Sequence, residues 1–285
     1  VRGMCAIVGY VGDSEALQIG LDALERMEYR GYDSAGIAVV EQGSLHLEKK
    51  EGKLQNLIDR IDEVGRDSFL GSTCIGHTRW ATHGRPNDVN AHPHRSFDGK
   101  VAIVHNGIIE NFSTLRAEIE AAGIELESET DSEVAAHLLA LAYNEGETAG
   151  DFQASALKVL SRLDGAFTVL FVHDDHPGTI VAGRRSTPLI VGVGEGEMFL
   201  GSDVAAFIDR TKNAVELGQD NAVVITADSY EIYDFDGNPV EGKPFTIDWD
   251  LDAAQKDGFD SFMMKEIHEQ PAAVRDTLAL SLIHI

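Results

Sequence analysis

The first residues of the chain that could do chemistry are Met4 and Cys5, which stand directly before the apolar run Ala6 to Val11. If the methionine were removed, Cys5 would carry its thiol and a free α-amine on the same α-carbon. The unperturbed pKa of an α-amine is about 8, close to that of a thiol, so the amine could accept the thiol proton near neutral pH. The alternative is a small buried cysteine that opens a core strand, and this stretch alone favours it.

Further polar residues gather where predicted strands end. His77 to Gly84 follow one strand, Asn90 to His94 form a loop, and His105-Asn106-Gly107 end a strand that begins at Val101. Residues at the ends of rigid strands often build functional sites. Asn-Gly is also a strong β-turn signal, so a plain turn is the alternative reading of Asn106-Gly107.

The same segment raises the alternative of a metal-dependent hydrolase. Its histidines are His77, His83, His92, His94 and His105, with Cys74 nearby. Their spacing matches neither His-Glu-x-x-His nor paired Cys-x-x-Cys, which are usual zinc patterns. We therefore predict no metal and expect His83, His92 and His105 to brace the loops of the site through hydrogen bonds. A chelator would separate the two enzyme classes, because a cysteine mechanism does not need the ion.

Composition restricts the possible partners. Forty-eight acidic residues against twenty-three basic ones give a formal charge of -25. This charge repels phosphate backbones and anionic membranes, so we expect neither nucleic acid nor a membrane as a partner. The two cysteines, Cys5 and Cys74, cannot form a disulfide framework, and no signal peptide or membrane-spanning run is evident. These features predict a cytoplasmic protein, in which Cys74 is inert core.

The predicted elements argue against a regularly alternating parallel sheet, because helices gather in the first half and strands in the second. Helices are predicted at Ser14–Met27, Lys53–Val64 and Asn111–Ala122, and a further helix after a capping box at Thr130–Glu133. We predict an α+β fold of two mostly antiparallel sheets packed face to face, with helices outside. Residues 1 to about 250 are expected to form one domain, followed by a helical segment from Asp252 to Leu278.

Several blocks in one order carry a resemblance to a known family. They are Met4-Cys5, Glu28 to Ser34, His77 to Gly84, Asn90 to His94, His105 to Asn111 and Glu129 to Asp131. From Met4 to about Leu278 the chain resembles the glutamine-hydrolysing domain of the isomerising glutamine:fructose-6-phosphate amidotransferases. These domains are N-terminal nucleophile hydrolases, so the resemblance implies a four-layer αββα sandwich.

The resemblance also implies a mechanism. The initiator methionine is removed, and Cys5 attacks the side-chain carboxamide of glutamine, so that ammonia leaves and water hydrolyses a γ-glutamyl thioester. It places the Asn106 side-chain amide and the Gly107 backbone N–H at the oxyanion of the tetrahedral intermediates, where each donor is worth roughly a hundredfold in rate. No cofactor is implied.

Further residues are expected to bind the substrate. The resemblance assigns Arg79 to the α-carboxylate of glutamine and Asp131 to its α-ammonium, makes Trp80 a mobile gate for ammonia, and adds Thr82 and His83 to the substrate site. Without it, Arg79 would be a surface salt-bridge residue, Asp131 a carboxylate at a helix start, and Trp80 a partly buried packing residue.

Two rivals and one departure remain. The phosphoribosyl-pyrophosphate amidotransferases share the N-terminal cysteine and the Asn-Gly pair, but their pattern has tyrosine where this chain has Trp80. A non-catalytic regulatory domain is the other alternative. The family has glycine after the nucleophile, whereas this chain has Ala6, whose methyl group could crowd the thiol.

The ends of the chain also depart from the family. We expect translation to begin at Met4, so that residues 1–3 are absent from the mature protein and residues 4–250 form the glutaminase domain. Residues 251–279 would lead towards a sugar-isomerase half, and residues 280–285 are expected to be non-native. In the family that second half aminates fructose 6-phosphate to glucosamine 6-phosphate. We expect the full-length protein to be a homodimer. The fragment alone is predicted to be the glutaminase half of this transaminase.

Overall fold

A computed structural model describes residues 5–41, 43–80, 85–248, 264, 267–268 and 270–271. The chain divides into two compact units, Val1–Ile247 and Asp248–Ile285. Most of the predicted helical segment after Asp252 lies outside the described residues. The five described residues within it are helical.

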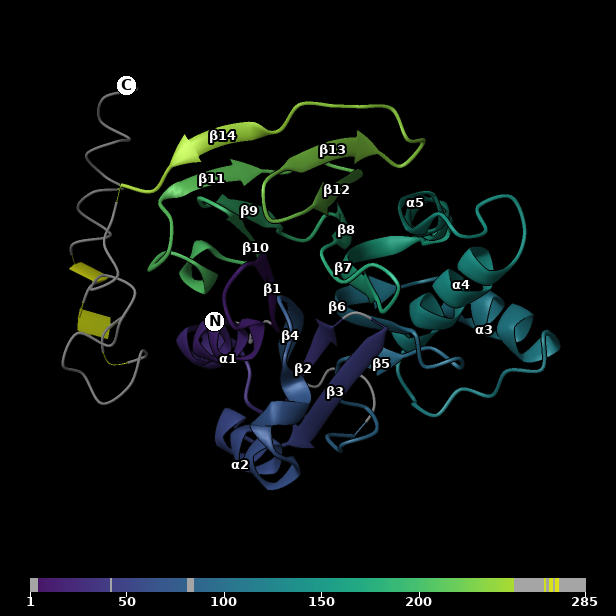
Figure 1. Ribbon diagram of the computed structural model, residues 1–285, viewed down its shortest axis with the longest axis horizontal. Helices are drawn as coiled ribbons and strands as arrows, with labels where there is room; N and C mark the ends of the chain where they lie inside the picture. The colour runs from purple at the N-terminus through teal and green to yellow at the C-terminus, as the bar shows by residue number, and fades with distance from the viewer. Residues whose placement is uncertain are drawn as a thin grey trace. The chain divides into compact units, whose positions relative to one another are not determined.

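The first unit contains two antiparallel sheets (Figure 1). The larger has eight strands in the order β14-β11-β9-β10-β1-β4-β2-β3. They are β1 (Ala6–Gly12), β2 (Ser34–Glu41), β3 (Ser44–Glu51), β4 (Thr73–Arg79), β9 (Ile190–Val193), β10 (Glu197–Gly201), β11 (Asn213–Glu216) and β14 (Lys243–Thr246). The smaller has six strands in the order β13-β12-β8-β7-β6-β5. They are β5 (His94–Arg95), β6 (Val101–Ile109), β7 (Gly165–His173), β8 (Ile180–Arg185), β12 (Asn221–Ile225) and β13 (Tyr230–Asp234).

Helices cover the outer face of each sheet. Helices α1 (Ala16–Met27) and α2 (Leu54–Val64) contact strands of the larger sheet, whereas α3 (Phe112–Ala121), α4 (Glu133–Asn144) and α5 (Phe152–Arg162) lie with the smaller one (Figure 1). The layers therefore run helix, sheet, sheet, helix, and the predicted four-layer α+β fold is confirmed. Within the described ranges, no helix combines the length and the apolar character that a membrane crossing needs.

The two sheets pack through an apolar core made by alternate residues of their strands. Ile7 of β1 and Ile75 of β4 meet Leu170 of β7 and Ala182 of β8 in this core. Because successive side chains of a strand point to opposite faces, every second residue of the central strands contributes to it. At Gly9 a Cβ would lie 3.0 Å from the Leu170 side chain, so this glycine lets the sheets approach closely. A second core lies between the smaller sheet and helices α3 to α5.

Some local predictions were wrong or incomplete. Helix α5 and strands β5, β11 and β14 were not predicted, although Asp151 caps α5 by accepting a hydrogen bond from the Ala154 N–H at 2.9 Å. The predicted capping box does not form, because the N-cap of α4 is Ser132 and it makes no side-chain cap bond. The Glu133 carboxylate instead accepts the Ser128 N–H at 2.7 Å and closes the preceding loop.

Replacement of Gly36 by alanine tests how closely a loop approaches β2. A Cβ at Gly36 would lie 2.1 Å from the backbone oxygen of His92, which is too short for any contact. We expect Gly36→Ala to lower the free energy of unfolding by roughly 1–3 kcal/mol, measured by urea denaturation, because backbone must move. Gly178→Ala is the matched control, since nothing lies within 4 Å of its added Cβ. Equal stabilities of the two variants would contradict the close approach.

Candidate active site

Cys5 lies immediately before β1, which hydrogen-bonds to β10 on one side and β4 on the other. Its thiol meets the backbone at the end of β4: the Trp80 N–H donates to Sγ at 3.2 Å, and Sγ lies 3.5 Å from the Trp80 oxygen. The thiol is partly buried. The pairing of β1 with β4 therefore holds the sulfur against one backbone position.

The surroundings of Cys5 keep the thiol protonated at rest. Burial raises its pKa, while the Trp80 N–H and the positive charge of Arg79 partly oppose that shift. Because the thiolate is the reactive form, a base must take the proton before the sulfur can attack.

Asn106 reaches this residue from the other sheet. Its Nδ2 donates a hydrogen bond to the Cys5 carbonyl oxygen at 3.0 Å. The alternative reading of Asn106-Gly107 as a turn is wrong, since both residues lie inside β6, where Gly107 pairs with Phe167 of β7. Gly107 has a φ of 120°, and a Cβ there would lie 2.0 Å from the Ala166 oxygen. This backbone shape therefore requires glycine.

His77 holds the far side of the Asn106 amide. Its Nε2 lies 2.9 Å from Asn106 Oδ1 and 3.1 Å from the His105 carbonyl oxygen. Burial lowers the pKa of His77 to about 3, so the ring is neutral near pH 7. No individual role was predicted for His77 from the sequence. The sequence feature that could have identified His77 is the alternation of side chains along a strand. This alternation puts His77 on the same face of β4 as Arg79 and the core residue Ile75.

Arg79 and Asp131 lie near each other at this edge of the sheets. Arg79 is only 4% exposed, so the alternative of a surface salt bridge is wrong. Burial lowers the pKa of its guanidinium, and the nearby Cys5, Asp33 and Asp131 oppose the shift. Asp131 Oδ2 accepts the Ile109 N–H of β6 at 2.7 Å. This carboxylate is thus anchored to the strand that carries Asn106.

Among the remaining residues of interest, the structure describes Trp80 and Ala6 but not Thr82 and His83. Trp80 is 37% exposed, and its ring stands edge-on to Tyr32 with the ring centroids 5.4 Å apart. Thr82 and His83 lie outside the described residues. Ala6 is fully buried and is the neighbour of Ile7, which faces the inter-sheet core. Its methyl group therefore points to the face of β1 opposite to that of Ile7.

Buried histidines pack behind the site. His92 lies between His77 and His94, with ring centroids 4.3 Å and 4.6 Å away. His105 Nδ1 lies 2.8 Å from Ser132 Oγ, as expected of a bracing residue. The same expectation for His92 is wrong, because neither of its ring nitrogens has a hydrogen-bond partner in the described part of the chain. His83 again lies outside that part.

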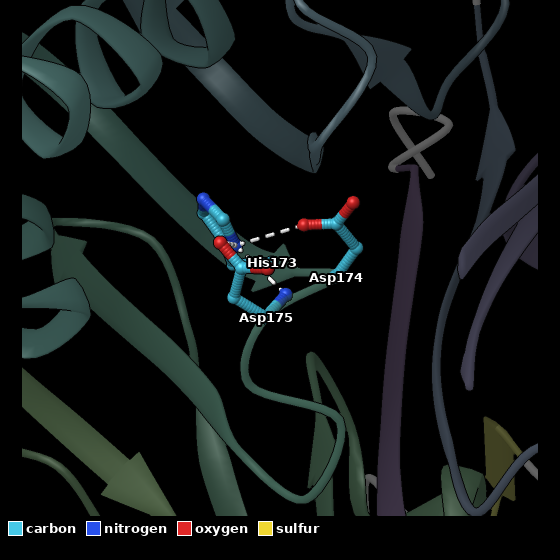
Figure 2. A group of neighbouring side chains, drawn as sticks. All are labelled: His173, Asp174 and Asp175. Carbon is cyan, nitrogen blue, oxygen red and sulfur yellow. Dashed lines mark hydrogen bonds and ion pairs between the residues drawn. The ribbon is translucent and has the colours of Figure 1, made fainter. Parts of the chain in front are cut away.

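Among the residues that the structure describes, one group of side chains has the composition of a metal site, and it lies away from Cys5. His173, Asp174 and Asp175 place one ligand atom each within 4.8 Å of one another, and Figure 2 shows the Asp174 carboxylate directed at the His173 ring. However, His173 Nδ1 accepts the Asp175 N–H at 3.1 Å, which occupies its lone pair. Lys100 Nζ already lies 3.2 Å from the Asp175 carboxylate. Two of its ligand atoms thus already have partners in the protein, whereas the buried His173 Nε2 and Asp174 Oδ1 have no hydrogen-bond partner among the described residues.

Comparison with known proteins identifies part of the chain. Residues 77–209 match the glutamine amidotransferase domain. The chain is 61% identical over 280 residues to the glutamine–fructose-6-phosphate aminotransferase (isomerizing) of Mycobacterium tuberculosis, covering 96% of this chain. It is 56% identical over 282 residues to the protein of the same name from Corynebacterium glutamicum. Residues 77–209 therefore form part of a glutamine amidotransferase domain.

The chain spans 45% of the length of each of those two relatives. Its fold is similar to that of glutamine phosphoribosylpyrophosphate amidotransferase from B. subtilis, with a TM-score of 0.68 at 24% identity. That match covers 82% of this chain and 50% of the other. At this identity the likeness concerns the fold alone.

The buried histidines predict that acid destabilises the domain. Burial places the pKa of His92 well below its usual value, and the nearby His77, His94, His105 and Arg79 lower it further. The unfolded chain, with a histidine pKa of about 6.5, therefore binds more protons than the folded one below that pH. Stability is fully present above about pH 6.5 and declines as the pH falls towards the folded pKa.

We expect the free energy of unfolding to fall between pH 7 and pH 5, and to fall by about 1–2 kcal/mol less in His92→Leu, since one such histidine is removed. Urea denaturation at both pH values measures this difference. Gly178→Ala is the control, because it replaces no ionisable group and should leave the pH dependence unchanged. A pH dependence in His92→Leu equal to that of the unsubstituted protein would contradict the assignment.

Proposed function

We propose that this domain hydrolyses L-glutamine to glutamate and ammonia, with Cys5 as the nucleophile. The observation that carries the proposal is the 3.0 Å hydrogen bond from Asn106 Nδ2 to the Cys5 carbonyl oxygen, which brings an amide donor from one sheet to the sulfur-bearing residue of the other. When the sulfur attacks the side-chain carbonyl carbon of glutamine, the carbonyl oxygen becomes an oxyanion. Hydrogen-bond donors beside Cys5 are needed to stabilise it. The family match and the burial of Arg79 at the same edge support the same reaction.

In the proposed reaction the α-amine of Cys5 accepts the thiol proton, and Sγ attacks the side-chain carbonyl carbon of glutamine. The second N–H of the Asn106 amide and the Gly107 N–H stabilise the resulting oxyanion. The C–N bond breaks, the nitrogen receives the proton and leaves as ammonia, and a γ-glutamyl thioester remains. Water then attacks the thioester, which releases glutamate and restores the thiol.

The substrate is held by its α-groups in this proposal. Arg79 has the planar fork that suits the α-carboxylate, and Asp131 has a carboxylate that can accept from the α-ammonium. Trp80 acts as a gate for ammonia, and Thr82 and His83 complete the substrate site. The exposure of the Trp80 ring and the partial burial of Asp131 support these roles.

We further propose that the full-length protein passes this ammonia to fructose 6-phosphate and forms glucosamine 6-phosphate. The names and the 56–61% identity of the relatives support this step over the phosphoribosyl-pyrophosphate reaction. In this proposal residues 4–250 form the glutaminase domain, residues 251–279 lead to the isomerase half, and the enzyme is a homodimer. The charge of -25 and the two free cysteines support a cytoplasmic setting.

The role of the α-amine is tested by comparing two forms of the chain. Translation from Met4 with removal of that methionine frees the amine of Cys5, whereas retention of residues 1–4 turns it into an amide that cannot act as a base. We expect glutamate release from glutamine to be roughly a hundredfold or more slower in the longer form, because a positioned base contributes about that much. Intact mass confirms each N-terminus.

Equal activity of the two forms would exclude the α-amine as the base. Cys5→Ala should abolish glutamate release in the shorter form, whereas Cys74→Ala should not, since Cys74 is buried and burial raises its pKa to about 12. EDTA should leave the rate unchanged, and inhibition by EDTA would favour the metal-dependent alternative.

Arg79→Lys tests substrate binding. A lysine keeps the charge but loses the planar fork, so we expect the KM for glutamine to rise roughly tenfold or more while kcat changes less. Steady-state glutamate release measures both constants. Arg95→Lys is the control, because Arg95 is exposed and donates to the Leu45 oxygen. Unchanged KM in Arg79→Lys would contradict the proposed contact.

A further inference from the structure

The hydrogen bonds around Asn106 fix which way its amide group faces. The Cys5 carbonyl oxygen can only accept, so the Asn106 atom 3.0 Å from it is the amide nitrogen. The amide oxygen therefore faces the other way, where His77 Nε2 lies at 2.9 Å. Both atoms near His77 Nε2 are acceptors, because the second is the His105 carbonyl oxygen at 3.1 Å.

This arrangement determines the tautomer of His77. A nitrogen between two acceptors must carry the hydrogen, so His77 is protonated at Nε2. Its Nδ1 is then a bare acceptor, and this buried atom has no hydrogen-bond partner among the described residues. Burial also keeps the ring neutral, as its lowered pKa indicates.

His77 contacts both the strand that follows Cys5 and the side-chain amide of Asn106. His77 pairs with Ile7 in the ladder between β4 and β1, and Ile7 is two residues from Cys5. Asn106 lies on β6 of the other sheet. The bond from His77 to Asn106 thus crosses between the sheets, and the strand ladder that positions Cys5 also positions the donor that orients the amide.

We propose that His77 is a positioning residue that orients the Asn106 amide, so that its N–H groups and not its oxygen face the Cys5 side. This inference rests on the proposed glutamine hydrolysis. Without the His77 donor, a half-turn of the amide would exchange its oxygen and nitrogen at nearly the same positions. The oxygen would then face the developing oxyanion and repel it.

Leucine and glutamine replacements separate the donor from the volume of the ring. We expect His77→Leu to lower kcat for glutamate release by roughly tenfold to a hundredfold, with KM changed less than about threefold. His77→Gln keeps an N–H donor and should recover most of the loss. His173→Leu is the matched control: His173 is also fully buried, but it lies opposite Val101 at the other end of β6. It should retain full activity.

Two further measurements distinguish orientation from general damage. Alkylation of Cys5 by iodoacetamide needs no oxyanion donor, so its rate should stay within about twofold in His77→Leu. Cys74 does not interfere, because it is fully buried. In an Asn106→Ala background, His77→Leu should cause no further loss, because it acts only through the amide. Multiplied losses in the double variant, or an alkylation rate that falls with kcat, would overturn the inference.

The tautomer can be measured without any substitution or turnover. In the wild-type chain, 15N NMR of the His77 ring near pH 7 should show a neutral imidazole protonated at Nε2. A neutral ring protonated at Nδ1 would overturn the inference even if the variants failed to fold. Failure of the proposed function has a different signature: the wild-type chain with a free Cys5 amine would be alkylated by iodoacetamide but would release no glutamate.

Discussion

The packing of the two sheets against each other determines whether this site exists. Cys5 adjoins β1 of the larger sheet, whereas Asn106 and Gly107 belong to β6 of the smaller one, so no single sheet contains both the sulfur and the donors. The apolar core that includes Ile7 and Leu170 sets the separation of the sheets. A change of core volume would therefore alter the geometry of the site as well as the stability, since close-packed interiors transmit strain.

Burial is the second general feature of the site. Arg79 and the histidines behind it are removed from water, and the Asp131 carboxylate is tied to a backbone N–H of β6. Charges that are fixed in a partly dry site act more strongly on a bound ligand than the same charges in water. The same burial makes the domain sensitive to acid. Burial of the site therefore strengthens its electrostatic interaction with a ligand and at the same time lowers the stability of the domain in acid.

Much of this could be predicted from the sequence. Apolar periodicity located the first helices and most strands, and the motif blocks identified Cys5, Asn106 and Arg79 as candidates. The turn signal at Asn106-Gly107 was misleading, because the strand continues through a glycine with positive φ that only the pairing with β7 explains. Glu133 likewise had the spacing of a capping box but closes a loop instead. His77 was missed because its partner comes from a different sheet, and local sequence carries no information about that contact.

The protonated state of the resting thiol has a consequence for the durability of the protein. Oxidation by peroxide begins from the thiolate, and its products beyond sulfenic acid are irreversible in most proteins. Burial raises the pKa of Cys5 and so reduces the fraction of the sulfur that is in the oxidisable thiolate form. A nucleophile that is deprotonated only as it reacts can thus persist between encounters with substrate in a cell that contains oxidants.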